Sequence, residues 1–306
     1  MKLHLILAVA LSAALPLCAI EWSPVSSGAW KKSENGEMTF NGSRFARLSA
    51  TLPLEKGVFY KFSWEARSAK PDGGKCVFLF IRDKRLALGH PLTANGEWQK
   101  NSVWFYSKTS GDARAYFDVP EKKDANWELR GFSIRRYTPQ EVEKLVWRDN
   151  FESGSLPVNF YLKKETPGNS LKIIKDDSFL SGTQSLVFEV GASTPRPDGI
   201  RSHYLPLLPG KSYLLTFWGK SGRDLIMQPG ISLWAPSGHQ GKHFTSLKKF
   251  AFTPEWKKYT MEFTVPENAS EYPDIQECMG MLIFMTNDPE ASGPIYLNEI
   301  SLKVMP

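Results

Sequence analysis

An internal repeat constrains the fold of this chain more than any other feature of its sequence. The stretch LPGKSYLLTFWGKS (208–221) matches the earlier stretch EKGVFYKFSWEARS (55–68): in both, a Gly is followed three residues later by a Tyr, and a small residue, a base and a Ser close the run. Two more pairs match in the same order, GEWQK (96–100) with PEWKK (254–258) and GFSIR (131–135) with EISLK (299–303). Repeats of this kind are typical of duplicated units, so the sequence predicts two copies of one fold.

The pattern within the repeat predicts β-structure. From Val58 to Arg67 apolar and polar residues alternate, with Tyr60, Phe62, Trp64 and Ala66 on one side and Lys61, Ser63, Glu65 and Arg67 on the other. A period of two is typical of an antiparallel strand that has one buried and one solvated face. Similar short stretches, separated by turn residues, recur along the chain and favour antiparallel sandwiches of the jelly-roll type.

The organisation that we expect is therefore all-β, with two tandem antiparallel jelly-roll sandwiches. We place the first module at 20–137 and the second, which has the clearer motifs, at 147–306. Between them, at 138–146, Thr138-Pro139-Gln140-Glu141 has the residues of a capping box with Pro at the first helical position, and it predicts a short helix from Pro139 to Leu145.

Residues 1–19 have the layout of a secretory signal peptide, with Lys2, an apolar run from Leu5 to Leu17 and a small residue at Ala19. We expect an exported protein that is periplasmic, bound at the cell surface or extracellular. The apolar run is too short to span a bilayer comfortably, so no transmembrane segment is predicted. Leu17 precedes Cys18 where lipoprotein signals usually have a small residue, which argues against a lipid anchor.

Composition excludes several classes of function. The formal net charge is +6, and the bases are scattered as pairs rather than gathered in a stripe, which argues against nucleic acid and is compatible with an anionic polysaccharide or cell surface. Beyond the signal peptide only Cys76 and Cys278 remain, at places that do not match between the repeats. Neither a disulfide framework nor a cysteine metal site is indicated.

The motifs of the second module resemble those of carbohydrate-binding modules of the cellulase-associated type and their galactose-binding-like relatives. They are DNFESG (149–154), SGTQSL (181–186), LPGKSYLLTFWGKS (208–221), PEWKKYTMEFTVP (254–266) and IYLNEISL (295–302). The first module matches only in part. The resemblance implies a two-sheet jelly roll and often the non-catalytic binding of a polysaccharide or glycan.

The same resemblance implies a structural calcium ion in the second module. Its candidate ligands are Glu152, Asn298 and Glu299, because calcium prefers hard oxygen ligands. Asn298 departs from the acid usual in the family, and Glu152 could equally be a solvated or helix-capping residue.

Aligning the repeats predicts which aromatic side chains point away from the cores. Trp218 stands where the first module has Glu65, and an outward apolar strip in the second module is expected. The strip would consist of Leu214, Trp218, Trp234 and Phe284, with Ile231 and Leu233 pointing inward and Ser232 outward. Flat exposed rings suit stacking against a sugar, although the strip could instead pack against the other module.

Further candidates for sugar binding lie near these positions or on the first module. Arg201, His203, Tyr204 and His239 could supply polar groups, and Trp104 and Tyr106 are predicted to point outward. Trp98 and Trp256 recur at the same strand entry in both repeats, and we expect both to be core residues.

Two other classes of function remain open at this point. One is a structural or adhesive surface protein that binds no sugar. The other is a polysaccharide lyase or glycoside hydrolase of jelly-roll type, for which Arg201, His203 and Tyr204 would be the starting point. No nucleophile elbow, phosphate loop or HExxH motif occurs in the sequence, so no catalytic residue is predicted.

Overall fold

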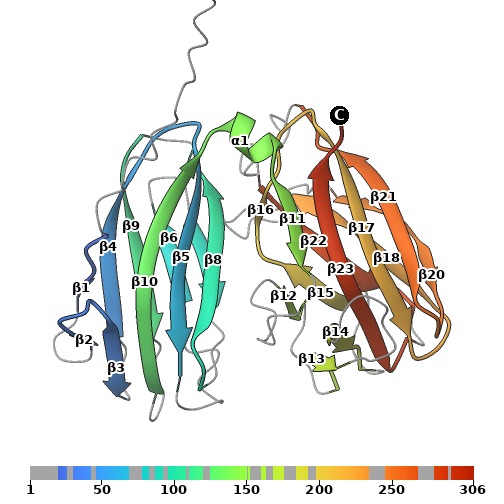
Figure 1. The fold of residues 1–306 in the computed structure, drawn as a ribbon, viewed down its shortest axis with the longest axis horizontal. Coiled ribbons are helices and arrows are strands. Elements are labelled where there is room, and N and C mark those ends of the chain that lie inside the picture. The colour runs from blue at the N-terminus through green and yellow to red at the C-terminus, as the bar shows by residue number, and fades with distance from the viewer. Residues whose placement is uncertain are drawn as a thin grey trace, which may run out of the picture.

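The computed structural model describes residues 20–25, 30–42, 46–68, 78–82, 87–91, 96–107, 110–119, 125–149, 151, 160–162, 168–175, 184–191, 198–233, 245–267, 279–288 and 291–306. In this part of the chain the elements are antiparallel strands and one short helix, and they form two sandwiches side by side (Figure 1). The predicted fold class, all-β with two tandem antiparallel sandwiches, is confirmed. Residues 1–19, the predicted signal peptide, lie outside the described residues.

The first module has one sheet in the order β1-β4-β9-β6-β7, here called the β9 sheet, and one in the order β2-β3-β10-β5-β8, the β5 sheet. From β3 to β10 the chain passes to the other sheet after every strand except β6, which is followed by β7 in the same sheet, and this alternation is typical of a jelly roll. The strands are β1 Ser23–Pro24, β2 Trp30–Lys32, β3 Met38–Gly42, β4 Ala46–Leu54, β5 Phe59–Arg67, β6 Phe78–Arg82, β7 Ala87–Pro91, β8 Gln99–Tyr106, β9 Gly111–Val119 and β10 Ala125–Tyr137.

The second module repeats this order. Its β17 sheet runs β13-β14-β23-β17-β21 with β11 beside β23, and its β22 sheet runs β12-β15-β22-β18-β19 with β16 beside β22 and β20 beside β18. The strands are β11 Val146–Asp149, β12 Phe160–Leu162, β13 Ser170–Lys175, β14 Gln184–Glu189, β15 Asp198–Ser202, β16 Leu205–Pro206, β17 Ser212–Ser221, β18 Leu225–Leu233, β19 Thr245–Leu247, β20 Phe250–Phe252, β21 Lys257–Thr264, β22 Met279–Thr286 and β23 Pro294–Val304.

Each sandwich encloses its own core, and period-two patterning decides which side chains enter it. Along β5 the residues Tyr60, Phe62 and Trp64 are buried in the first core, while the residues between them are half-buried on the outer face. Along β17, Tyr213 and Phe217 enter the second core in the same way. Alternate side chains of a strand point to opposite faces, so one strand supplies both a core and an outer surface.

The Gly-x-x-Tyr motif builds the same corner in both modules. Gly57 and Gly210 have φ angles of +82° and +71°, which favour glycine, and they turn the chain into β5 and β17. Three residues on, the Tyr60 hydroxyl accepts a hydrogen bond from the Glu55 backbone N–H at 2.8 Å. The Tyr213 hydroxyl accepts one from the Leu208 N–H at 2.7 Å. The repeated motif thus satisfies a backbone donor at each turn.

The base and the Trp of the repeat also meet in both modules, on the outer face. The Arg67 guanidinium lies 4.6 Å from the centroid of Trp98, and the Lys220 ammonium lies 4.9 Å from that of Trp256. Both Trp side chains are half-buried outside the cores, so their prediction as core residues was wrong. The two Trp residues recur because each provides the aromatic face over which the cation of its module lies, and this contact is on the solvent side of each sheet.

The two modules meet through a third apolar cluster. The first module contributes Phe59, Trp104 and Tyr137 from the outer face of its β5 sheet. These residues pack against Val142 of the connecting helix and against two buried residues of the second module, Leu208 and Met279. This junction fixes how the outer face of β5 and β8 is presented to the second module.

The connecting helix α1, Pro139–Glu143, has the capping box that its sequence predicts (Figure 1). The Thr138 hydroxyl accepts a hydrogen bond from the Glu141 backbone N–H at 3.2 Å, and the Glu141 carboxylate accepts one from the Thr138 N–H at 2.7 Å. The helix is anchored on one side by buried Val142 and on the other by a 2.7 Å ion pair between Glu143 and Lys211.

We predict unequal losses of stability when the two corner tyrosines are replaced by Phe. Tyr213→Phe leaves the buried Leu208 N–H without its acceptor and should lower the free energy of unfolding by about 2 kcal/mol. Tyr60→Phe affects a half-buried donor and should cost about 1 kcal/mol. Urea denaturation of both variants measures these differences. Tyr296→Phe, on the outer face, is the control and should change stability little; equal effects in all three would contradict the role of the corner hydrogen bonds.

Candidate functional site

The predicted outward strip of the second module does not exist as one surface. Leu214 and Trp218 do lie half-buried on the outer face of the β17 sheet. Phe284, however, is fully buried in the second core, where its ring meets Phe217 edge-on at 5.1 Å. Its prediction as an outward residue was wrong, because a register error of one residue moves every side chain of a strand to the opposite face.

The neighbouring predictions on β18 have a mixed outcome. Ile231 and Leu233 point into the core as expected. Ser232 points the other way, with its hydroxyl 3.2 Å from that of Thr245, yet it is buried rather than exposed. Trp234 and His239 lie outside the described residues. Because β17 and β18 belong to opposite sheets of the sandwich, residues on their outer faces cannot form a continuous row.

Three of the other candidates come together at the junction between the modules. Trp104 is 8% exposed and belongs to the junction cluster, while Tyr106 and Tyr204 pack against it. Trp104 and Tyr106 point away from the first core, as the sequence predicts. Arg201, on β15, is not among the described residues around the junction pocket.

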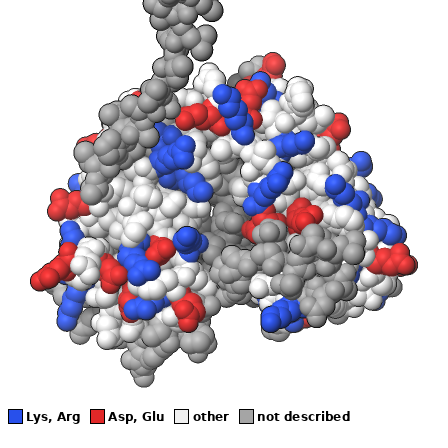
Figure 2. All heavy atoms as spheres, viewed as in Figure 1, with Lys and Arg blue, Asp and Glu red and all other residues white. Residues whose placement is uncertain are grey.

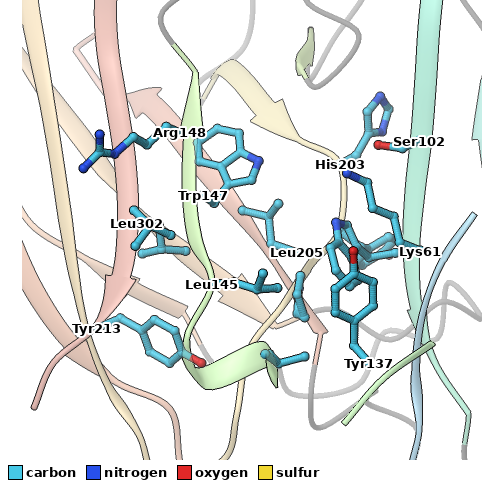
Figure 3. A pocket seen from close by; sticks show the side chains of 15 residues that line it. Lys61, Ser102, Tyr137, Leu145, Trp147, Arg148, His203, Leu205, Tyr213 and Leu302 are labelled. Carbon is cyan, nitrogen blue, oxygen red and sulfur yellow. The ribbon is translucent and has the colours of Figure 1, made fainter. Parts of the chain in front are cut away.

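A pocket of about 340 Å³ opens at this junction and is lined from both modules (Figure 3). The first module and the connecting segment contribute side chains from β5, β8, β10 and α1, and the second contributes β11, β16 with the segment before it, β17 and β23. The lining residues are Lys61, Ser102, Trp104, Tyr137, Val142, Leu145, Val146, Trp147, Arg148, His203, Tyr204, Leu205, Pro206, Tyr213 and Leu302.

Aromatic rings form the walls of the pocket. Trp104 and Tyr137 pack against each other on the first-module side, with ring centroids 4.7 Å apart. On the opposite side Trp147 is half-buried and meets Phe160 edge-on at 6.0 Å, and Figure 3 shows its indole N–H turned toward the pocket. A ring with one apolar face and a polar edge can contact both the apolar and the hydroxyl groups of a ligand.

Polar groups gather at one end of the pocket. In Figure 3 the Lys61 ammonium, the Ser102 hydroxyl and the His203 imidazole project toward the same region. Lys61 and Ser102 lie on the same face of adjacent strands in diagonal positions, since Lys61 pairs with Trp104 and Ser63 with Ser102. Arg148 also lines the pocket, but its guanidinium is turned away in this view.

Lys61 is electrostatically unusual among these groups. Burial lowers the pKa of its ammonium, and the charge of the neighbouring Arg135 lowers that pKa further. The ammonium lies 5.7 Å from the centroid of the Trp104 ring. Burial costs a charged amine part of its hydration, so Lys61 is held in the pocket at some expense of stability.

Of the residues that line the pocket, sequence reasoning singled out Trp104, His203 and Tyr204 and missed the others. Lys61 appears in the sequence only as one of the polar residues of an outward strand, and nothing in its spacing distinguishes it from Ser63 or Glu65. The residues on the second-module side, such as Trp147 and His203, line the same pocket as Lys61 only because of how the two modules are oriented. A cross-module contact leaves no periodic signal in a single sequence.

The predicted calcium ligands are only partly described. Glu152 lies outside the described residues. Asn298 is buried and holds strands together: its amide donates to the Gln184 carbonyl at 2.8 Å, and its side-chain oxygen accepts from the Glu299 N–H at 2.7 Å. Glu299 is exposed, at a β-bulge with a φ of +44°. Calcium takes six to eight oxygens, so these two residues alone do not make a site, and the ion stays a prediction.

The described part of the chain contains no group of three or more His, Cys, Asp or Glu side chains placed to hold a metal ion. It likewise contains no helix of sufficient length and apolarity to cross a membrane. On the face drawn in Figure 2, positive and negative side chains are interspersed rather than sorted into one stripe, with bases on both sides of the junction.

No protein-family model matches the chain, and no curated protein matches it. Solved structures similar to it include the N-terminal CBM22-1-CBM22-2 tandem domain of Xyn10C from Paenibacillus barcinonensis, at 12% identity and a TM-score of 0.40 over 92% of this chain and 94% of that one. The CBM22-1 xylan-binding domain of the same protein is 13% identical, with a TM-score of 0.39 over 52% and 92%.

A third similar structure contains the CBM22-1 and GH10 modules of xylanase 10B from Clostridium thermocellum, at 13% identity and a TM-score of 0.38 over 52% of this chain and 28% of that one. The fold itself follows from the strand order described above.

We predict that Lys61→Met stabilises the protein at neutral pH, because it removes a desolvated charge. The pKa of Lys61 is lower in the folded than in the unfolded chain, so the unfolded chain binds more protons between the two pKa values and wild-type stability rises with pH there. The advantage of the variant should therefore be largest near pH 7 and shrink toward pH 10. Urea midpoints across this range test it.

Lys220→Met is the matched control, since it removes a lysine that lies over an aromatic ring on the other module. It should not raise the urea midpoint. A Lys61→Met variant that is less stable than wild type at pH 7 would contradict the electrostatic argument.

Proposed function

We propose that this protein is an exported, non-catalytic carbohydrate-binding protein and that the sugar binds in the pocket between its two modules. The observation that supports this most is the composition of that pocket, in which the rings of Trp104, Tyr137 and Trp147 stand close to the polar groups of Lys61 and Ser102. Aromatic side chains combined with a small number of convergent polar groups are typical of the lining of a small-ligand site.

Sugar suits this combination better than a purely apolar ligand does. One face of a pyranose ring presents C–H groups that stack on an aromatic ring, and its edge presents hydroxyls that need donors and acceptors. Trp147 offers a ring with its N–H turned toward the pocket, and Ser102 and His203 offer groups that can both donate and accept. A pyranose therefore matches both kinds of group that line this pocket.

The junction packing favours binding because it holds the two halves of the site in place. Trp104 and Tyr137 are themselves members of the apolar cluster that joins the modules. A site formed in advance loses less conformational entropy when the ligand enters, which improves affinity. Export, expected from residues 1–19, would place the pocket where polysaccharides are found.

Replacing Trp147 by Ala should weaken binding of the cognate polysaccharide at least tenfold, since the variant loses the ring on the second-module wall. Wild-type protein spanning residues 20–306 is first screened against a glycan array and insoluble polysaccharides, and affinities for the best ligand are then measured by isothermal titration calorimetry. Circular dichroism confirms that the variant is folded.

Trp256→Ala is a closely matched control. Like Trp147, Trp256 is a half-buried indole of the second module with an edge-on aromatic neighbour, Tyr296 at 6.3 Å, but it lies outside the pocket. Its removal should leave the affinity within about twofold. Equal losses in both variants would overturn the assignment of the site, and shortening of the polysaccharide during incubation would overturn the non-catalytic role.

The structural or adhesive alternative has one observation in its favour, the extensive aromatic packing of the junction. If the wild-type protein binds no glycan, that packing serves only to join the modules. The lyase or hydrolase alternative gains less, because His203 and Tyr204 line the pocket whereas Arg201 is not among its described lining residues.

A further inference from the structure

We propose that the sugar bound in the pocket is acidic, and that the Lys61 ammonium contacts its carboxylate. This inference rests on the proposed function and specifies its substrate class. A uronic acid is the common sugar of this chemistry.

The charge of the pocket is one-sided. Its described lining contains Lys61, His203 and Arg148, whose guanidinium is turned away, but neither Asp nor Glu. The aromatic walls are neutral, so nothing in that lining balances the ammonium of Lys61. An anionic group of the ligand would supply the missing negative charge at the polar end of the pocket.

Three other outward bases of the same sheet differ from Lys61. Arg67 pairs with Glu128, with 2.7 Å between Nε and the carboxylate, and Arg130 pairs with Glu65 at 2.7 Å. Arg136 pairs with Glu55. Each pair joins β5, or the turn before it, to β10. Among the described residues, no carboxylate forms such a pair with Lys61, although its ammonium is partly buried.

The residue directly opposite Lys61 makes the arrangement more unusual. On β10 the cross-strand partner of Lys61 is Arg135, a second base, whereas Glu65 faces Arg130 and Arg67 faces Glu128. Like charges in directly opposed positions destabilise a sheet. The Arg135 guanidinium lies 4.6 Å from the centroid of Tyr137, a pocket residue, although Arg135 itself is not among the described lining residues.

A bound carboxylate would relieve this repulsion. Functional sites are commonly less stable without their ligand than a site optimised for stability alone. The opposed cations Lys61 and Arg135 are an arrangement of this kind. A uronate suits the geometry, because its carboxylate projects from the edge of the ring. With the sugar face against Trp104 or Trp147, that edge can turn toward the end of the pocket where Lys61 and Ser102 lie.

The test compares each acidic polysaccharide with a neutral form of the same backbone. Polygalacturonate, alginate and glucuronoxylan are each measured beside a version whose carboxylates have been converted to methyl esters, with a sulfated galactan as a different anion. Calorimetry or affinity electrophoresis gives the affinities. We expect at least one acidic polymer to bind about tenfold more tightly than its ester, and this difference to shrink as salt is raised.

Variants at one position then assign the contact. Lys61→Met should reduce the affinity for the acidic polymer to that for its ester, whereas Lys61→Arg should retain most of the preference. Lys220→Met, on the outer face of the second module, should leave it unchanged. Since Lys61→Met is expected to be at least as stable as wild type, loss of folding does not account for loss of binding.

The outcomes separate this inference from the proposed function. Equal binding of an acidic polymer and its ester, or of a neutral polysaccharide irrespective of Lys61, would overturn the acidic substrate and leave carbohydrate binding intact. Equally tight binding of the sulfated galactan would overturn the inference that the pocket recognises a carboxylate in particular. Absence of binding to every polysaccharide, acidic or neutral, would overturn both proposals.

Discussion

The apolar packing between the modules is the interaction on which the candidate site depends. The side chains of Phe59, Trp104 and Tyr137 project from the outer face of the first module and are buried against α1 and the second module. A sheet face that would otherwise be solvated thereby becomes one wall of a pocket. Because buried aromatic area is a strong source of stabilisation, the same rings that join the modules can also present the site.

The repeated motifs explain the fold more than the function. Both copies keep the glycine turn, the tyrosine that accepts a backbone hydrogen bond, and the base that lies over a tryptophan. These features recur because each copy has the same turn, whose backbone N–H group requires an acceptor, and the same outer face, where the cation and the ring pack together. The pocket, in contrast, uses different residues from each copy, among them Lys61 and Trp147, so it breaks the symmetry of the repeat.

Much of the fold could be predicted from the sequence, because strand alternation and turn chemistry are local. The strand expected at Val58–Arg67 is β5, Phe59–Arg67, and the helix expected at Pro139–Leu145 is α1, Pro139–Glu143. The prediction failed at Phe284, where the alignment of the repeats slipped by one residue. It also could not find Lys61, whose significance comes from the module opposite and from Arg135 on a strand far along the chain.

The capped helix between the modules has a consequence for how affinity should vary with ligand length. The helix with its capping box and buried Val142, the ion pair to Lys211 and the apolar junction join the two sandwiches through direct contacts rather than through a tether alone. Two tethered modules that each bind one polymer chain gain affinity through effective concentration as the chain grows longer. If the sugar binds in the pocket between the modules, as proposed, affinity should instead reach a plateau once an oligosaccharide fills that pocket.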